Sequence, residues 1–256
     1  MNKSGPGLFE AVIESWRLVI ANAGELARIA LVPFLLFIAL NRLEATFEPE
    51  GMGILARDLL FTVLAAPPAA MLLMPWYRRL LSTADPAMAA RPAMWWSVAL
   101  MVRWVGLDIM VFAALAPVLA MAIQADAAGG EAAPPPEILF IYLTTIIIGF
   151  YLFYGRMGLS VPAAAAESDH RYRRSWVATR ENGWRIGLAF LLCWVPIQFL
   201  IEILGEPLDV ENPTMAMQYF NAALGAAVRV LSELVGAAVF AQFYLAQTAP
   251  PLEGEW

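Results

Sequence analysis

The chain has 256 residues, of which 61% are apolar and 15% are charged, and its formal net charge is −6. Mean hydropathy is +0.65, whereas a soluble domain is usually about half apolar, so the composition excludes a soluble domain and predicts a polytopic membrane protein. Cys193 and His170 are the only cysteine and histidine. An internal disulfide and most haem, zinc and copper sites are therefore excluded, and we expect no cofactor and no metal.

Six stretches have the length and the low charge of membrane-spanning helices, since a bilayer core needs about 20 mostly apolar residues. In chain order they cover approximately 26–40, 59–77, 104–124, 138–155, 186–204 and 220–247. Prolines are tolerated inside such helices because neighbouring helices satisfy the freed backbone groups, and we expect a kink at Pro67-Pro68. Met1 is not followed by the pattern of a cleavable signal peptide, so the first span is expected to act as its own insertion signal.

A short amphipathic stretch with a tryptophan precedes each pair of spans. Trp16, Trp96 and Trp176 lie at intervals of 80 residues. In two copies an asparagine follows a serine by seven positions, over 15–22 and over 175–182, whereas the middle copy lacks the asparagine. Because such stretches place large apolar side chains in the headgroup boundary, these tryptophans are expected to be anchors at the membrane interface.

The 80-residue period predicts how the chain is organised, since internal periodicity outranks local signals. We expect one all-α integral membrane domain over residues 1–256 with six transmembrane helices. These would form three repeats, each an interfacial amphipathic helix followed by a transmembrane hairpin, over approximately 8–80, 86–160 and 168–247.

The distribution of basic residues predicts the orientation in the membrane. All 16 Lys and Arg residues except Arg42, Arg57 and Arg229 fall on the side that holds the N-terminus. Because Lys and Arg accumulate on the cytoplasmic side, we expect a multi-pass bacterial inner-membrane protein with both termini in the cytoplasm. The acidic residues gather in the connections on the opposite side of the membrane, so the negative net charge is a property of that face. The charge gives no indication about nucleic-acid binding, and the sequence contains no motif that reads a nucleic-acid groove.

Ionisable residues within the spans are the candidate binding groups, because a charge in the bilayer is costly and usually faces the helix bundle. Asp108 lies in the third span, and Arg156 ends the fourth at similar depth, so we expect these two to pair. Arg229 and Glu233 are four residues apart in the sixth span and are expected to pair on one helix face. Asp108 and Glu233 are expected toward opposite leaflets. A structural role for each charge remains open beside a binding role.

The segments Arg156–Ala163 (RMGLSVPA) and Ser175–Arg185 (SWVATRENGWR), together with Ser15-Trp16 and Asn22, carry a family resemblance. They resemble a group of bacterial six-span membrane proteins similar to YciC-like proteins and to the membrane domain attached to some glycerophosphodiester phosphodiesterases. The phosphodiesterase catalytic domain is absent, so the resemblance implies an inner-membrane protein and transfers no activity.

The sequence favours a non-enzymatic membrane protein that acts as a scaffold, as an accessory component of a membrane complex, or in lipid organisation. Its expected partners are membrane lipids and other membrane proteins, and no nucleic acid. Two alternatives stay open. A small-solute or cation transporter or channel fits the internal repeats and proline-broken spans. The second alternative is an intramembrane enzyme that modifies lipid through Asp108 or Glu233. It is the weaker one, because neither carboxylate has a nucleophile or a metal as a partner in the sequence pattern.

Overall fold

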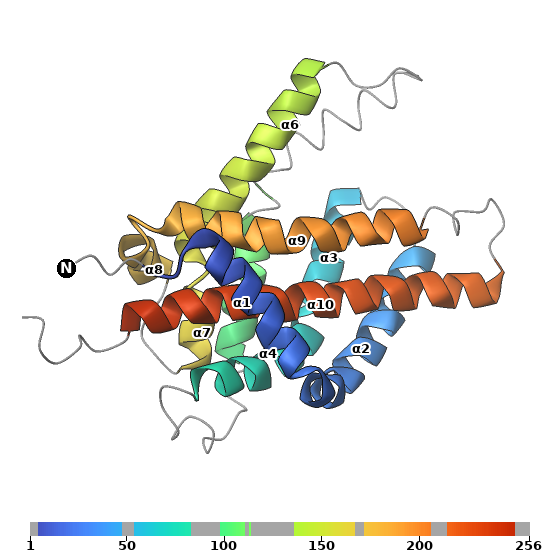
Figure 1. Cartoon of the computed structure of the whole chain (residues 1–256). Helices are drawn as coiled ribbons and strands as arrows, with labels where there is room; N and C mark the ends of the chain where they lie inside the picture. Colours follow the sequence, from blue (N-terminus) through green and yellow to red (C-terminus); the bar gives the residue numbers. More distant parts are fainter. Residues whose placement is uncertain are drawn as a thin grey trace, which may run out of the picture.

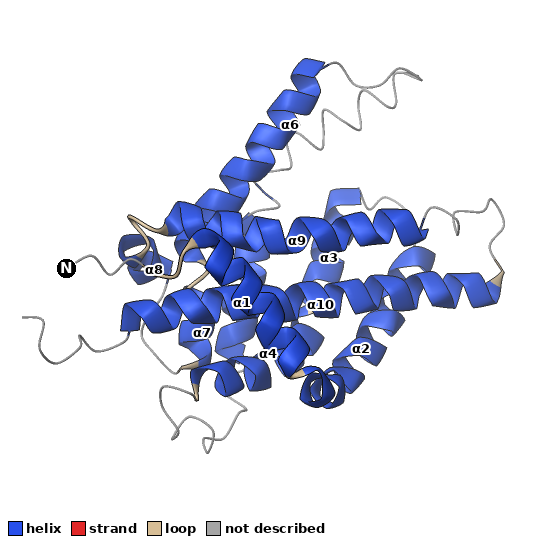
Figure 2. Cartoon of the chain, in the orientation of Figure 1, coloured by secondary structure: helices blue, strands red, loops and turns tan. Residues whose placement is uncertain are grey.

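A computed structural model describes residues 5–47, 54–82, 98–110, 113, 136–166, 172–205 and 214–248. All secondary structure in these ranges is helical (Figure 2). The labelled helices are α1 (Leu8–Ala21), α2 (Ala23–Thr46), α3 (Ile54–Leu64), α4 (Ala66–Leu81), α6 (Pro136–Gly149), the π-helix η2 (Phe150–Gly155), α7 (Ser160–Ala165), α8 (Tyr172–Ala178), α9 (Gly183–Gly205) and α10 (Met215–Thr248). Residues 98–110 form a further helix.

Three helices are long and apolar enough to cross a membrane, namely α2, residues 183–200 of α9, and α10. The α3–α4 pair passes the same test as one bent span. The all-helical membrane class predicted from the sequence is therefore supported. The third predicted span lies mostly outside the described residues, and the fourth is divided into α6 and η2. The count of six spans stays a prediction.

Helix α10 is the centre of the bundle. It lies beside α9, while α1 crosses both, and it also packs against α2, α4 and α7 (Figure 1). Small residues allow this close packing: Ala226 and Ala238 are fully buried, and Phe190 of α9 occupies the space where a side chain on Gly236 would lie. At Gly236 the backbone of α10 is thus in close contact with α9.

The α3–α4 span is bent by 42°. Helix α3 ends at Leu64 and α4 begins at Ala66, so Pro67 and Pro68 fall in the first turn of α4. Proline suits that position because its missing N–H would be unpaired there anyway. The kink expected at the proline pair therefore lies immediately before it, and the second half of the span, α4, is largely buried against α2 and α10.

The two described amphipathic stretches turn into their spans by the same hydrogen bonds. We call residues 15–22 the first elbow and residues 175–182 the third elbow. The Asn22 carbonyl accepts hydrogen bonds from the Glu25 and Leu26 amides at 3.0 and 2.9 Å. In the same way, the Asn182 carbonyl accepts from the amides of residues 185 and 186 at 3.0 and 3.2 Å. Residues 91–97, which hold the middle copy, lie outside the described residues, so the threefold repeat stays a prediction.

Helix α1 turns Ala11, Ser15 and Val19 toward the bundle and exposes Phe9, Ile13 and Ile20 on its outer face. Ala11 and Ser15 are fully buried against the bundle, and Gln242 of α10 donates to the Ser15 hydroxyl at 2.8 Å. Phe9 and Ile13 are 70% and 67% exposed. In a chain with membrane spans, this arrangement suits a helix that contacts lipid with its outer face.

Candidate functional site

Two carboxylates, one guanidinium and two aromatic polar groups gather inside the bundle. Tyr154 of η2 donates its hydroxyl to Asp108 Oδ1 at 2.8 Å. Trp104, one turn before Asp108, donates its indole N–H to Glu233 Oε2 of α10 at 2.9 Å. The Arg229 guanidinium lies over the Trp104 ring, 5.6 Å from its centroid. We call these five residues the polar cluster.

Arg229 is held mainly by aromatic faces. Its guanidinium also lies 5.0 Å from the ring centroid of Phe37 in α2, and a cation over a ring face is attracted by about 0.5–2 kcal/mol. Asp108 and Glu233 are both electrostatic neighbours of Arg229 and of each other. The polar cluster thus combines two acids with one base, and Glu44 of α2 is a further acidic neighbour of Arg229.

This arrangement corrects two expectations from the sequence. Asp108 and Glu233 were expected toward opposite leaflets, but they interact within one cluster. In the described part of the chain, no ion pair joins Arg229 to Glu233; the Trp104 indole is bonded to the acid and its ring faces the base. A spacing of four residues places two groups on one helix face. The spacing does not show that a side chain of a neighbouring helix, here Trp104, contacts both groups in place of an ion pair.

The sequence predicted that Arg156 pairs with Asp108, but the structure gives Arg156 other partners. Its guanidinium instead donates to the carbonyls of Trp176 at 2.8 Å and Arg180 at 3.1 Å, and it stacks over the Trp176 ring at 4.6 Å. The Arg156 side chain is therefore bound to the third elbow, while Asp108 has Tyr154 as its partner. Similar depth along two helices gives no information about the direction in which each side chain points.

The third elbow is fastened to the end of η2 from both sides. The hydroxyls of Ser175 and Thr179 donate to the Arg156 carbonyl at 2.9 and 3.0 Å, and all three residues are buried. Gly155 lies so close to Gly183 that a Cβ on Gly155 would meet the Gly183 carbonyl. We call these contacts the Arg156 junction. The two segments that carried the family resemblance thus meet here, and this gives them a structural role.

Helix α8 also docks on the helix at 98–110. The Tyr172 hydroxyl donates to the Arg103 carbonyl at 2.6 Å and lies against Gly106, where a Cβ would clash with it. Burial raises the pKa of Tyr172 to about 12, so the hydroxyl remains a donor at physiological pH. Arg103 in turn donates to the Ser160 carbonyl at 2.7 Å. The Tyr172 contact thus places α8 against the helix at 98–110, and the Arg103 contact joins that helix to the first residue of α7.

The tryptophans predicted as interfacial anchors have different surroundings. Trp16 is half-buried on α1, and Trp176 is 38% exposed while stacking under Arg156. Trp96 lies outside the described residues. A common plane for the three tryptophans therefore stays a prediction.

Sequence reasoning missed Trp104 and Tyr154 as members of the polar cluster. One signal was available for Trp104, because it precedes Asp108 by four residues and so shares its helix face. Tyr154 gave none, since tyrosine is common in spans. Among the described residues, no group of three His, Cys, Asp or Glu side chains is arranged to hold a metal ion. The hydrogen bonds of the cluster join the helix at 98–110 to η2 and to α10, so the cluster is suited to fixing helix positions.

Comparison with protein-family models, curated proteins and solved structures found no match for this chain.

Removing the Tyr154 hydroxyl is expected to cost more stability than neutralising its partner. Tyr154→Phe leaves the half-buried Asp108 carboxylate without its donor, which costs about 1–3 kcal/mol. Asp108→Asn keeps an oxygen that can accept the same hydrogen bond, so its cost is expected to be smaller. Thermal unfolding of the two variants in one detergent measures the difference, and a larger loss in Asp108→Asn would contradict this geometry.

Proposed function

We propose that the protein is a non-enzymatic integral membrane scaffold or accessory subunit that organises lipids or protein partners at the cytoplasmic leaflet. The proposed form is six spans in three repeats, inserted in a bacterial inner membrane with both termini in the cytoplasm. The apolar outer surface is the observation that carries this proposal. Large apolar side chains point outward along the helices that are long enough to cross a membrane, whereas the polar cluster lies between helices.

The outward side chains lie on several helices, of which α2 and α9 are two of those long enough to cross a membrane. On α2, Leu31, Val32 and Leu35 are each more than half exposed, and on α9 the same holds for Phe199 and Ile203. In water such a surface would promote association; in a bilayer it meets lipid tails or another transmembrane helix. Since α2 and α9 both expose such surfaces, the protein offers two apolar faces for partners.

A transporter remains the second candidate, because the polar cluster brings Asp108, Arg229 and Glu233 together. Acids and bases within membrane spans often mark proton or ion pathways. If this second function holds, Glu233→Gln is expected to abolish solute or proton movement in liposomes while leaving the fold intact. The scaffold proposal expects no such movement by either form.

Native mass spectrometry of the protein, purified from its own membrane in a mild detergent, tests the proposed function. A protein partner in a fixed ratio, or a defined set of retained lipids, is the expected result. A protein that carries neither, and that moves a solute when reconstituted, would replace the scaffold proposal by the transporter.

A further inference from the structure

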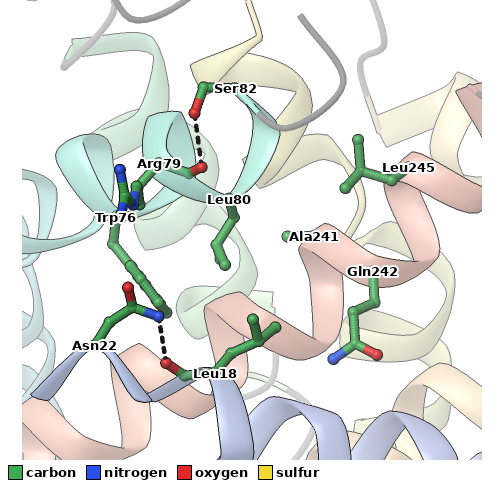
Figure 3. A pocket seen from close by; sticks show the side chains of 9 residues that line it. All are labelled: Leu18, Asn22, Trp76, Arg79, Leu80, Ser82, Ala241, Gln242 and Leu245. Atoms are coloured by element: carbon green, nitrogen blue, oxygen red, sulfur yellow. Dashed lines mark hydrogen bonds between the residues drawn. The ribbon is translucent and has the colours of Figure 1, made fainter. Parts of the chain in front are cut away.

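A cavity of about 510 Å³ opens between α1, the end of α4 and the end of α10 (Figure 3). Ligand sites in proteins commonly have volumes of about 300–1,000 Å³, so this cavity has room for part of a small organic molecule. Its walls come from α1, α4 and α10, with Asn22 from the turn between α1 and α2 and Ser82 from just after α4. The lining residues are Leu18, Asn22, Trp76, Arg79, Leu80, Ser82, Ala241, Gln242 and Leu245.

One part of the cavity wall is cationic and polar. Arg79 and Ser82 lie at the end of α4. Asn22, between α1 and α2, also lines the cavity, and its side-chain amide donates to the Leu18 carbonyl at 2.7 Å (Figure 3). Arg79 forms an ion pair with Glu25 at 3.6 Å, in which the two side chains are 56% and 49% exposed. A pair so exposed contributes at most about 1 kcal/mol, so a phosphate can displace the carboxylate, and arginine binds phosphate with two parallel hydrogen bonds.

The remaining wall is apolar. Leu18 of α1, Leu80 of α4 and Leu245 of α10 line the cavity together with the Trp76 ring, and Leu18 and Leu80 point toward its middle (Figure 3). The Gln242 side-chain amide is bonded to Ser15. A ligand for this cavity therefore carries one anionic group and an adjoining hydrocarbon portion.

We propose that this cavity binds an anionic phospholipid of the cytoplasmic leaflet, with its phosphate at Arg79 and the beginning of an acyl chain among Leu18, Leu80 and Leu245. The proposal rests on the proposed function, since it requires the end of α4 to lie at the cytoplasmic membrane surface. A free phosphate compound shares the anionic chemistry but leaves the leucine wall uncovered. The lipid is preferred because it fills both parts of the wall.

Titration with phosphatidylglycerol, followed by native mass spectrometry and thermal unfolding, tests the site. Wild-type protein is expected to bind one phosphatidylglycerol at least tenfold more tightly than phosphatidylcholine with the same chains. Arg79→Gln is expected to remove this preference. Glu25→Gln is expected to strengthen phosphatidylglycerol binding severalfold, because it removes the competing carboxylate. The matched control is Arg17→Gln, since Arg17 is an exposed α1 arginine paired with Glu14 and lies outside the cavity.

A variant that fills the cavity tests the apolar part separately. Leu245→Trp leaves the Arg79–Glu25 pair in place but occupies the space assigned to the acyl chain, so it is expected to weaken phosphatidylglycerol binding as well. This variant keeps the proposal testable if Arg79→Gln does not fold. Unchanged phosphatidylglycerol binding by folded Leu245→Trp would overturn the position of the acyl chain.

Two results would overturn the lipid assignment. Equal stabilisation by inorganic phosphate and phosphatidylglycerol would identify a free phosphate compound as the ligand. Equal binding of phosphatidylglycerol and phosphatidylcholine by wild type would remove the role of Arg79. Either result leaves the proposed function standing if a protein partner co-purifies, so the two proposals fail separately.

Discussion

Gly155→Ala is expected to be among the most destabilising single-methyl additions in the described part of the chain. The new Cβ would meet the backbone carbonyl of Gly183, and a backbone atom cannot rotate away as a side chain can. Overpacking a well-packed core costs about 1–3 kcal/mol and occasionally more, and we expect about 3 kcal/mol here because η2 and α9 must separate. Thermal unfolding in detergent, with folded yield after membrane extraction, measures the effect.

Gly149→Ala is the matched control for this prediction. It adds the same methyl group six residues earlier, where no heavy atom lies within 4 Å of the added Cβ. Because alanine favours a helix over glycine by about 1 kcal/mol, Gly149→Ala is expected to be neutral or slightly stabilising. If both variants unfold at the same temperature, the close approach of Gly155 to Gly183 is wrong.

Arg156→Met is expected to be the most destabilising removal of a polar side chain in this region. Methionine keeps apolar volume but removes the guanidinium donor from the part-buried Trp176 and Arg180 carbonyls, and an acceptor that loses its partner away from water costs about 1–3 kcal/mol. The stacking on Trp176 is lost as well. Arg156→Lys keeps the charge but not the planar donor fork, so an intermediate loss of stability is expected. Thermal unfolding measures both.

Arg185→Met serves as the control because Arg185 also stacks on a tryptophan, Trp184, at 5.4 Å. That tryptophan is 49% exposed, so the contact is worth only about 0.5–1 kcal/mol. A stability loss in Arg156→Met no larger than that in Arg185→Met would show that the two carbonyl hydrogen bonds contribute nothing.

The elements that the sequence predicted well depend on short-range physics. Apolar length is enough to identify α2, α9 and α10, since a bilayer demands about 20 such residues. The Ser-to-Asn spacing identified the two elbows, because the asparagine carbonyl accepts the first amide bonds of the following helix in both. The proline pair identified the bend between α3 and α4. Each of these features is determined by neighbouring residues along the chain.

The contacts that the sequence did not predict depend on the rotation of helices about their axes. Asp108 and Arg156 have similar expected depth, yet Asp108 turns toward Tyr154 and Arg156 toward Trp176. Hydrophobicity is high around the whole circumference of such spans, so periodicity does not show the inward face. The meeting of residues 156–163 with residues 175–185 was likewise unpredictable, although both segments stood out as motifs.

Cysteine labelling of membrane sidedness tests the central claim, namely that both elbows lie at the cytoplasmic surface of a multi-span protein. Exposed reporter positions are available in a Cys193→Ser background: Arg17→Cys and Arg180→Cys in the elbows, and Met215→Cys at the start of α10. A membrane-impermeant maleimide is expected to label both elbow reporters only in inside-out vesicles and Met215→Cys only in spheroplasts. Labelling of Arg17→Cys and Arg180→Cys from opposite sides would contradict the repeat, the orientation and the proposed lipid site together.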